Sequence, residues 1–187
     1  TNKLKHAEGV ADLATEKLLD QRMAGIDAVK HPNVQPPPSD YHRVVFRGGL
    51  MNVRTKVMLE RAELYWAGNA AFTITQGSYN PGGVAASAGA HDGGGSLDIS
   101  VRGKSQADIN RMVRSLRQAG FAAWARTPAD GFSPHIHAIA IGDREASPLA
   151  KAQMQNYFAG RNGLKNNGPD RNANVGRPWP TWATKFD

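Results

Sequence analysis

The most regular alternation of apolar and polar residues in the chain is the sequence LDISV, which begins at Leu97. In a β-strand, successive side chains point to opposite faces, so the three apolar residues share one face while Asp98 and Ser100 share the other. We therefore predict a strand over residues 97–101 that carries a carboxylate on its polar face.

Further strands and helices are expected on both sides of this segment. Residue types and spacing indicate strands over residues 71–75, 121–126 and 135–141. Caps followed by apolar stripes predict helices that begin at Asn52, Ser105 and Ser147 and end near residues 66, 119 and 158. Apolar residues three and four apart predict one more helix over residues 3–30.

Strands joined by loops, with helices before and after them, favour an α+β fold: a single domain with a mostly antiparallel sheet and helices on one face. Glycine and proline gather near residues 32–38, 77–95 and 160–180. We expect an N-terminal helix and proline-rich linker over residues 1–40, a central domain over 41–160 and an extended polar tail over 161–187.

Composition narrows the classes of function. No run of about 18 apolar residues occurs, so no membrane span is expected. The net charge of +7 and the pI near 9.9 favour polyanionic partners, including anionic cell-wall polymers. The basic residues are scattered rather than clustered, so nucleic acid is not the expected partner. The 187 residues include no cysteine, so a metal site must use histidine and carboxylate ligands.

Two short segments supply such ligands. His135 and His137 are two residues apart in a predicted strand, so both imidazoles project from one face. His91 and Asp98 flank the glycine-rich sequence DGGGSL, which allows a tight turn between them. Two histidines and one carboxylate, with a fourth position left for water, are typical of catalytic zinc, whereas structural sites have four protein ligands.

The ligand spacing resembles that of a known enzyme family. The sequences SAGAHDGGGSLD and SPHIHAIAIG, within residues 45–142, are similar to the zinc D-alanyl-D-alanine carboxypeptidases and L-alanyl-D-glutamate endopeptidases that cut peptidoglycan stem peptides. The resemblance implies a zinc ion held on the sheet by three ligands, which are His91, Asp98 and His137. One branch of the family carries a glutamate three residues before the last ligand, where this chain has Pro134. The chain therefore resembles the His-x-His branch, which implies a catalytic role for His135.

The substrate-binding residues are less well defined by this resemblance. The family usually has an arginine before the first ligand, and this chain lacks one there, so Gln76 or Tyr79 would have to orient the substrate. Arg126, on a strand expected next to the site, is a second candidate that could bind a carboxylate. The alternative for Arg126 is an ordinary surface charge.

The resulting hypothesis is a zinc-dependent hydrolase of a peptide bond in the peptidoglycan stem peptide, either a phage lysin or a secreted bacterial enzyme. Such an enzyme would act in the cell wall or periplasm, or after release from a phage-infected cell. The alternative is a non-catalytic, zinc-stabilised module for wall binding or signalling with the same fold. Because all candidate ligands lie between residues 91 and 137, both ends of the chain are expected to be dispensable for the chemistry.

Overall fold

The computed structural model describes residues 35–66, 71–178 and 180–184, which belong to one compact unit beginning at Gln35. The helix expected over residues 3–30 lies outside these residues. In the described part of the chain, no helix has the length and apolar character needed to cross a membrane.

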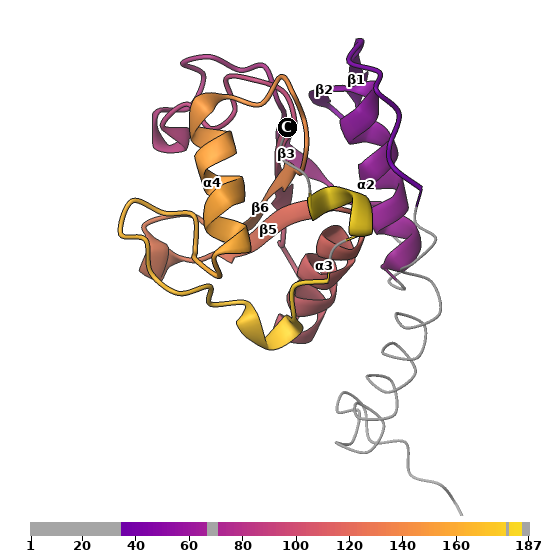
Figure 1. Ribbon diagram of the computed structural model, residues 1–187. Helices are drawn as coiled ribbons and strands as arrows, with labels where there is room; N and C mark the ends of the chain where they lie inside the picture. The colour runs from indigo at the N-terminus through magenta and orange to yellow at the C-terminus, as the bar shows by residue number, and fades with distance from the viewer. Residues whose placement is uncertain (1–34, 67–70, 179, 185–187) are drawn as a thin grey trace, which may run out of the picture. The chain divides into compact units, whose positions relative to one another are not determined.

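A four-stranded antiparallel sheet with the strand order β3-β4-β6-β5 forms the centre of the fold (Figure 1). Its strands are β3 (Ile74–Gln76), β4 (Ser96–Ser100), β5 (Phe121–Arg126) and β6 (His135–Ala140). The last three agree with the sequence prediction to within one residue at each end, whereas β3 begins three residues later than expected. The predicted α+β class with a mostly antiparallel sheet is confirmed.

Three helices accompany the sheet in the described residues: α2 (Val53–Tyr65), α3 (Gln106–Gln118) and α4 (Pro148–Phe158). Each follows the cap residue predicted for it. The side chains of Asn52, Ser105 and Ser147 each accept a hydrogen bond from the backbone N–H three residues later. These bonds satisfy amides that have no partner within the helix and fix where each helix starts.

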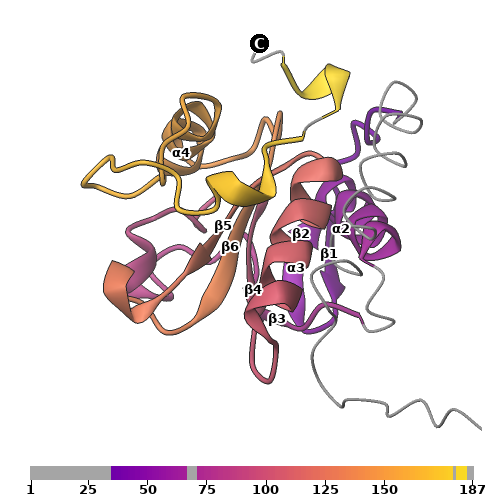
Figure 2. The ribbon, with the colours of Figure 1, turned by 90° about the horizontal axis from the view of Figure 1, so that it is seen from below.

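The two faces of the sheet pack against different helices (Figure 2). One face buries Leu97 and Ile136 against apolar residues of α2 and α3, including Met58 and Leu116. On the opposite face, α4 packs against the β5 and β6 side, where the apolar cluster contains Trp124, Ile139, Met154 and Tyr157. The helices therefore lie on both faces of the sheet rather than on one face as expected, because Trp124 and Ile139 give the second face an apolar patch that α4 covers. The polar groups of β4 and β6 lie on the same face as α4.

The sequence prediction did not include a hairpin formed by β1 (Arg43–Phe46) and β2 (Gly49–Asn52). Its two-residue turn places Arg47 and Gly48 at positive φ, 52° and 79°. Hairpin turns of this kind usually carry asparagine or aspartate before glycine, so the arginine gives no recognisable signal.

The C-terminal segment differs from the extended tail that was expected. Its described residues, 161–178 and 180–184, have mostly irregular backbone but pack against the domain. The fully buried Arg117 of α3 donates hydrogen bonds to the Asn172 carbonyl oxygen at 3.1 Å and to the Asp170 carboxylate at 2.8 Å. A buried cation needs such partners, so residue 160 does not mark a boundary between the domain and a free tail.

Candidate metal site

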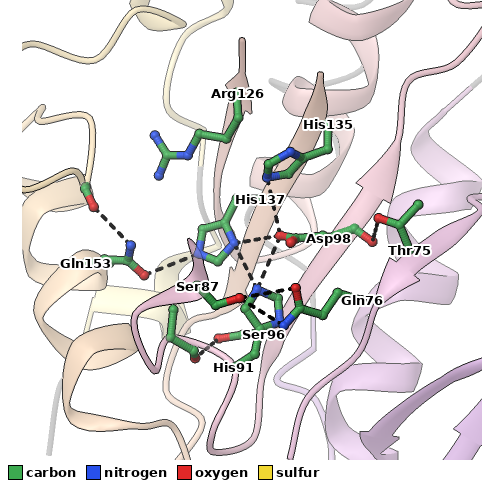
Figure 3. A network of polar contacts seen from close by, with 12 residues as sticks. Thr75, Gln76, Ser87, His91, Ser96, Asp98, Arg126, His135, His137 and Gln153 are labelled. Carbon is green, nitrogen blue, oxygen red and sulfur yellow. Dashed lines mark hydrogen bonds and ion pairs between the residues drawn. The ribbon is translucent and has the colours of Figure 1, made fainter. Parts of the chain in front are cut away.

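Three predicted ligands meet on the polar face of the sheet. Asp98 of β4 pairs directly with His137 of β6, and their side chains leave the same face. His91 reaches them from the loop before β4 (Figure 3). The shortest distances are 2.8 Å from His137 Nδ1 to Asp98 Oδ1, and 3.3 Å from His91 Nε2 to each of these two atoms.

The loop that carries His91 is held in place by backbone contacts. The amide of Gly94 donates to the Glu145 carbonyl oxygen at 2.8 Å, and Ser96 Oγ donates to the Ala90 carbonyl oxygen at 2.8 Å. A Cβ atom at Gly93 would lie 2.2 Å from that Glu145 oxygen, so only glycine fits there. The glycines between the two ligands therefore allow the close backbone approach that the sequence suggested.

The outward-facing nitrogen of each histidine ligand has an acceptor that fixes the tautomer. His91 Nδ1 lies 2.9 Å from the Gly77 carbonyl oxygen, which can only accept a hydrogen bond. His137 Nε2 lies 3.2 Å from Gln153 Oε1, and the amide nitrogen of Gln153 donates to the Gly163 carbonyl oxygen at 3.0 Å. Both outer nitrogens therefore carry the ring hydrogen. Each inner nitrogen, His91 Nε2 and His137 Nδ1, keeps a free lone pair.

Three lone pairs, from His91 Nε2, His137 Nδ1 and Asp98 Oδ1, consequently point at one another within 3.3 Å. Such an arrangement is repulsive unless a proton or a cation lies among them. Tetrahedral zinc ligands about 2.0–2.1 Å from the ion would be about 3.4 Å apart. The two separations of 3.3 Å and the donor types fit a zinc ion held by these three residues, whereas the 2.8 Å between His137 Nδ1 and Asp98 Oδ1 is a hydrogen-bond distance.

Burial and charge favour the ligand forms of these side chains. Burial lowers the pKa of His137, and although Asp98 opposes this effect, the net shift favours the neutral imidazole. For Asp98, burial alone would raise the pKa. When a proton instead of a metal lies among these atoms, hydrogen bonds to Asp98 from the protonated rings of His137 and His91, together with their charges, outweigh that effect and hold the pKa of Asp98 well below its usual range. Neutral histidine and ionised aspartate are the forms that bind metals.

His135 lies beside this group without belonging to it. Its Nε2 is 3.7 Å from Asp98 Oδ1, and its Nδ1 is 2.7 Å from the Ser133 carbonyl oxygen, which fixes the tautomer with Nε2 free. Its side chain is 17% exposed, whereas that of His91 is 1% exposed. His135 therefore offers an accessible lone pair next to three buried ligand atoms.

A cavity of about 230 Å³ opens over these residues. Its wall includes His91, Asp98, His135 and His137 together with apolar side chains, which are Val84, Ala86, Ala90, Phe132 and Leu164. The volume suits a short peptide segment rather than a folded partner.

The three predicted substrate-binding residues have different surroundings. Gln76 lines the cavity and exchanges hydrogen bonds with Ser87. Arg126 also lines the cavity and is 4% exposed, so the alternative of a surface charge is wrong. Tyr79 is not among the lining residues, and its hydroxyl instead contacts Glu145 and the Asn52 amide. The structure therefore brings Gln76 and Arg126 to the site and places Tyr79 in a separate polar network.

No sequence pattern indicated the groups that orient the histidines. Two of these groups are backbone carbonyls, which any residue could supply, and the third is Gln153 on α4. Trp124 of β5 was also missed, and it stacks on His137 with ring centroids 6.3 Å apart. Neither side chain belongs to a motif, so only the packing of α4 and β5 reveals them.

Comparisons of the chain with protein-family models, with curated proteins and with solved structures found no significant match.

Proposed function

We propose that this protein is a zinc-dependent peptidase that hydrolyses a peptide bond in the stem peptides of peptidoglycan. The observation that carries the proposal is the convergence of three lone pairs, from His91, Asp98 and His137, beside a cavity. A structural zinc site would have four protein ligands, whereas these three leave a position for water.

A bound zinc ion would supply Lewis acidity, polarising a substrate carbonyl and making water a nucleophile near neutral pH. His135 has the geometry of the accompanying general base and acid. Its Nε2 carries a lone pair toward the site, and the Ser133 carbonyl holds the ring in that orientation. An imidazole in this position can accept a proton from water and later donate it to the leaving amine.

The substrate class rests on the ligand spacing in the sequence and on the cavity. His91 and Asp98 seven residues apart, followed by His135 and His137, resemble the peptidoglycan peptidases. The cavity is small enough to select a peptide segment, and the net charge of +7 favours approach to an anionic wall. The proposed place of action is the cell wall, reached by secretion or by release from a phage-infected cell.

Digestion of purified cell-wall sacculi tests the proposal. The zinc-loaded full chain should release muropeptides with one new amine and one new carboxyl group, identified by mass spectrometry, and chelator-treated protein should not. A His135→Ala variant with bound zinc provides the matched inactive control. If the zinc-loaded chain binds sacculi but cleaves nothing, the peptidase proposal is wrong and the non-catalytic module is favoured.

A further inference from the structure

Arg126, at the end of β5, is a buried cation with an incomplete set of partners. Its Nη1 donates to the Asn162 carbonyl oxygen at 2.7 Å, and its guanidinium carbon lies 5.1 Å from the centre of the Trp124 ring. Its Nη2 is buried and has no hydrogen-bond partner. Among the residues that the structure describes, no carboxylate forms an ion pair with it.

The missing partner is costly because the guanidinium is charged. Burial lowers the pKa of Arg126 to about 10, so the side chain remains cationic near neutral pH. A buried cation without a counter-ion is unfavourable unless a ligand completes its contacts, and a carboxylate matches the planar geometry of guanidinium. Because Arg126 lines the cavity, a ligand bound there can supply the missing counter-ion.

The charges around the cavity also favour an anion. When the histidines are neutral, Arg126 and Asp98 are the two charged residues among those that line the cavity. A divalent ion among the ligands would outweigh Asp98 by one positive charge, and Arg126 would add a second. The apolar walls and the small volume bring any bound group close to both centres.

We propose that Arg126 anchors a carboxylate that the substrate carries within one residue of the scissile bond. This inference rests on the proposed peptidase function and narrows it to substrates with such a group. Either a terminal carboxylate or the free α-carboxylate of a γ-linked glutamate would have this chemistry. The corresponding carboxamide has a similar shape but lacks the charge, so it should be a poor substrate.

Two synthetic pairs of stem peptides distinguish these substrates. One pair carries a terminal D-alanine as acid or amide, and the other carries the glutamate α-carboxyl as acid or amide. For the pair that contains the cleaved bond, the zinc-loaded chain should prefer the acid by about 10- to 100-fold in kcat/KM, as expected for a hydrogen bond to a charged group. Arg126→Met should remove that preference, and Arg102→Met, which removes an exposed positive charge, should keep it.

A binding measurement keeps the inference testable apart from activity. Calorimetric titration of the metal-free full chain with the same pairs should show tighter binding of an acid than of its amide, and Arg126→Met should abolish the difference. If the unmodified chain cleaves or binds acid and amide equally well, the proposed role of Arg126 is wrong. This result does not depend on whether the Arg126→Met variant folds. If the zinc-loaded chain cleaves neither sacculi nor peptides, the peptidase function fails, and the titration alone decides whether Arg126 binds a carboxylate.

Discussion

At the residue scale, the two histidines of β6 lie on the same face of the sheet and have different neighbours. His137 is buried between Asp98, His91 and Gln153, and its inner nitrogen contacts both ligand partners. His135 is partly exposed at the cavity, and its Nε2 lies 3.7 Å from Asp98 Oδ1. The same residue type therefore has two different roles in the proposed mechanism.

Replacing each of these histidines by alanine should separate metal binding from turnover. His137→Ala removes one of three ligands and should lower zinc affinity severely. His135→Ala should keep about one zinc per chain and lose about 10²–10⁴-fold in turnover, which is typical of a lost general acid or base. Elemental analysis and muropeptide cleavage measure the two effects. Loss of zinc in His135→Ala would show that His135 is a ligand.

Gln153 should affect zinc affinity although it is not a ligand. Its side-chain oxygen Oε1 accepts a hydrogen bond from His137 Nε2, and this bond directs Nδ1 of the same ring toward the metal position. Gln153→Leu removes this acceptor and should weaken zinc binding by about 10- to 100-fold, the usual effect of losing such an outer partner. Competition with a zinc chelator measures the change. Gln155→Leu, on the exposed side of the same helix, is the control and should bind zinc normally.

At the scale of elements, local signals predicted the helices and the strands that carry the ligands. Side-chain caps at Asn52, Ser105 and Ser147 act within four residues, so their signal is complete in the sequence. Alternation along β4 similarly placed Asp98 opposite the core. The β1–β2 hairpin was missed because Arg47 occupies a left-handed position that seldom holds arginine.

Contacts between distant segments explain what the sequence could not predict about the site. The ligand types and their spacing are visible in the chain, but the carbonyls of Gly77, Ser133 and Gly163 have no identifying side chain. The packing of residues 161–163 was missed because polar and glycine-rich sequences are typical of solvated tails. The carbonyls of these three residues accept hydrogen bonds from the side chains of Trp124, Arg126 and Gln153, which lie earlier in the chain.

The ion pair between Arg117 and Asp170 should be important for the stability of the C-terminal segment. The two side chains are 0% and 1% exposed, so Asp170→Ala would leave a buried charge without its partner. We expect a loss of about 3–5 kcal/mol in the free energy of unfolding. Glu60→Ala, which breaks the partly exposed pair with Lys56, should cost about 1 kcal/mol or less. Urea unfolding measures the loss in the free energy of unfolding for each variant. Equally small losses in the two variants would contradict the structural role of the segment.

Removal of the whole C-terminal segment should affect both stability and zinc binding. Truncation after residue 160 removes acceptors of Arg117, at Asp170 and Asn172, and the carbonyl of Gly163 that orients Gln153. The truncated chain should therefore be less stable and bind zinc more weakly, contrary to the dispensability that the sequence suggested. Thermal unfolding and chelator competition measure both effects, and a truncated chain with unchanged zinc affinity would show that the orienting contact is unnecessary.

At the scale of the whole molecule, zinc binding and folding should be linked through pH. The pKa of His137 is lowered by burial, so below the usual histidine value of about 6.5 the unfolded chain binds a proton that the folded chain resists. The stability of the metal-free protein should therefore fall as the pH falls through this range. Protons also compete with zinc for the same nitrogens, which acts in the same direction.

Calorimetry at pH 7.5 and pH 5.5 tests this linkage. Zinc at about 1,000 times its Kd should stabilise the fold by about 4 kcal/mol at the higher pH. The same total zinc should raise Tm less at the lower pH, and His91→Ala should reduce the zinc-dependent shift at both. A zinc-dependent shift that does not change with pH would contradict the assignment of neutral histidines as ligands.

The contact from Gly163 to Gln153 also sets an order of events during synthesis. Ribosomes make chains from the N-terminus, so His91, Asp98 and His137 are all translated before the carbonyl that indirectly orients the last of them. A nascent chain that ends before residue 163 would contain every ligand but lack the group that fixes the amide of Gln153. The metal site would thus reach its final form only after this late segment leaves the ribosome and packs onto the domain.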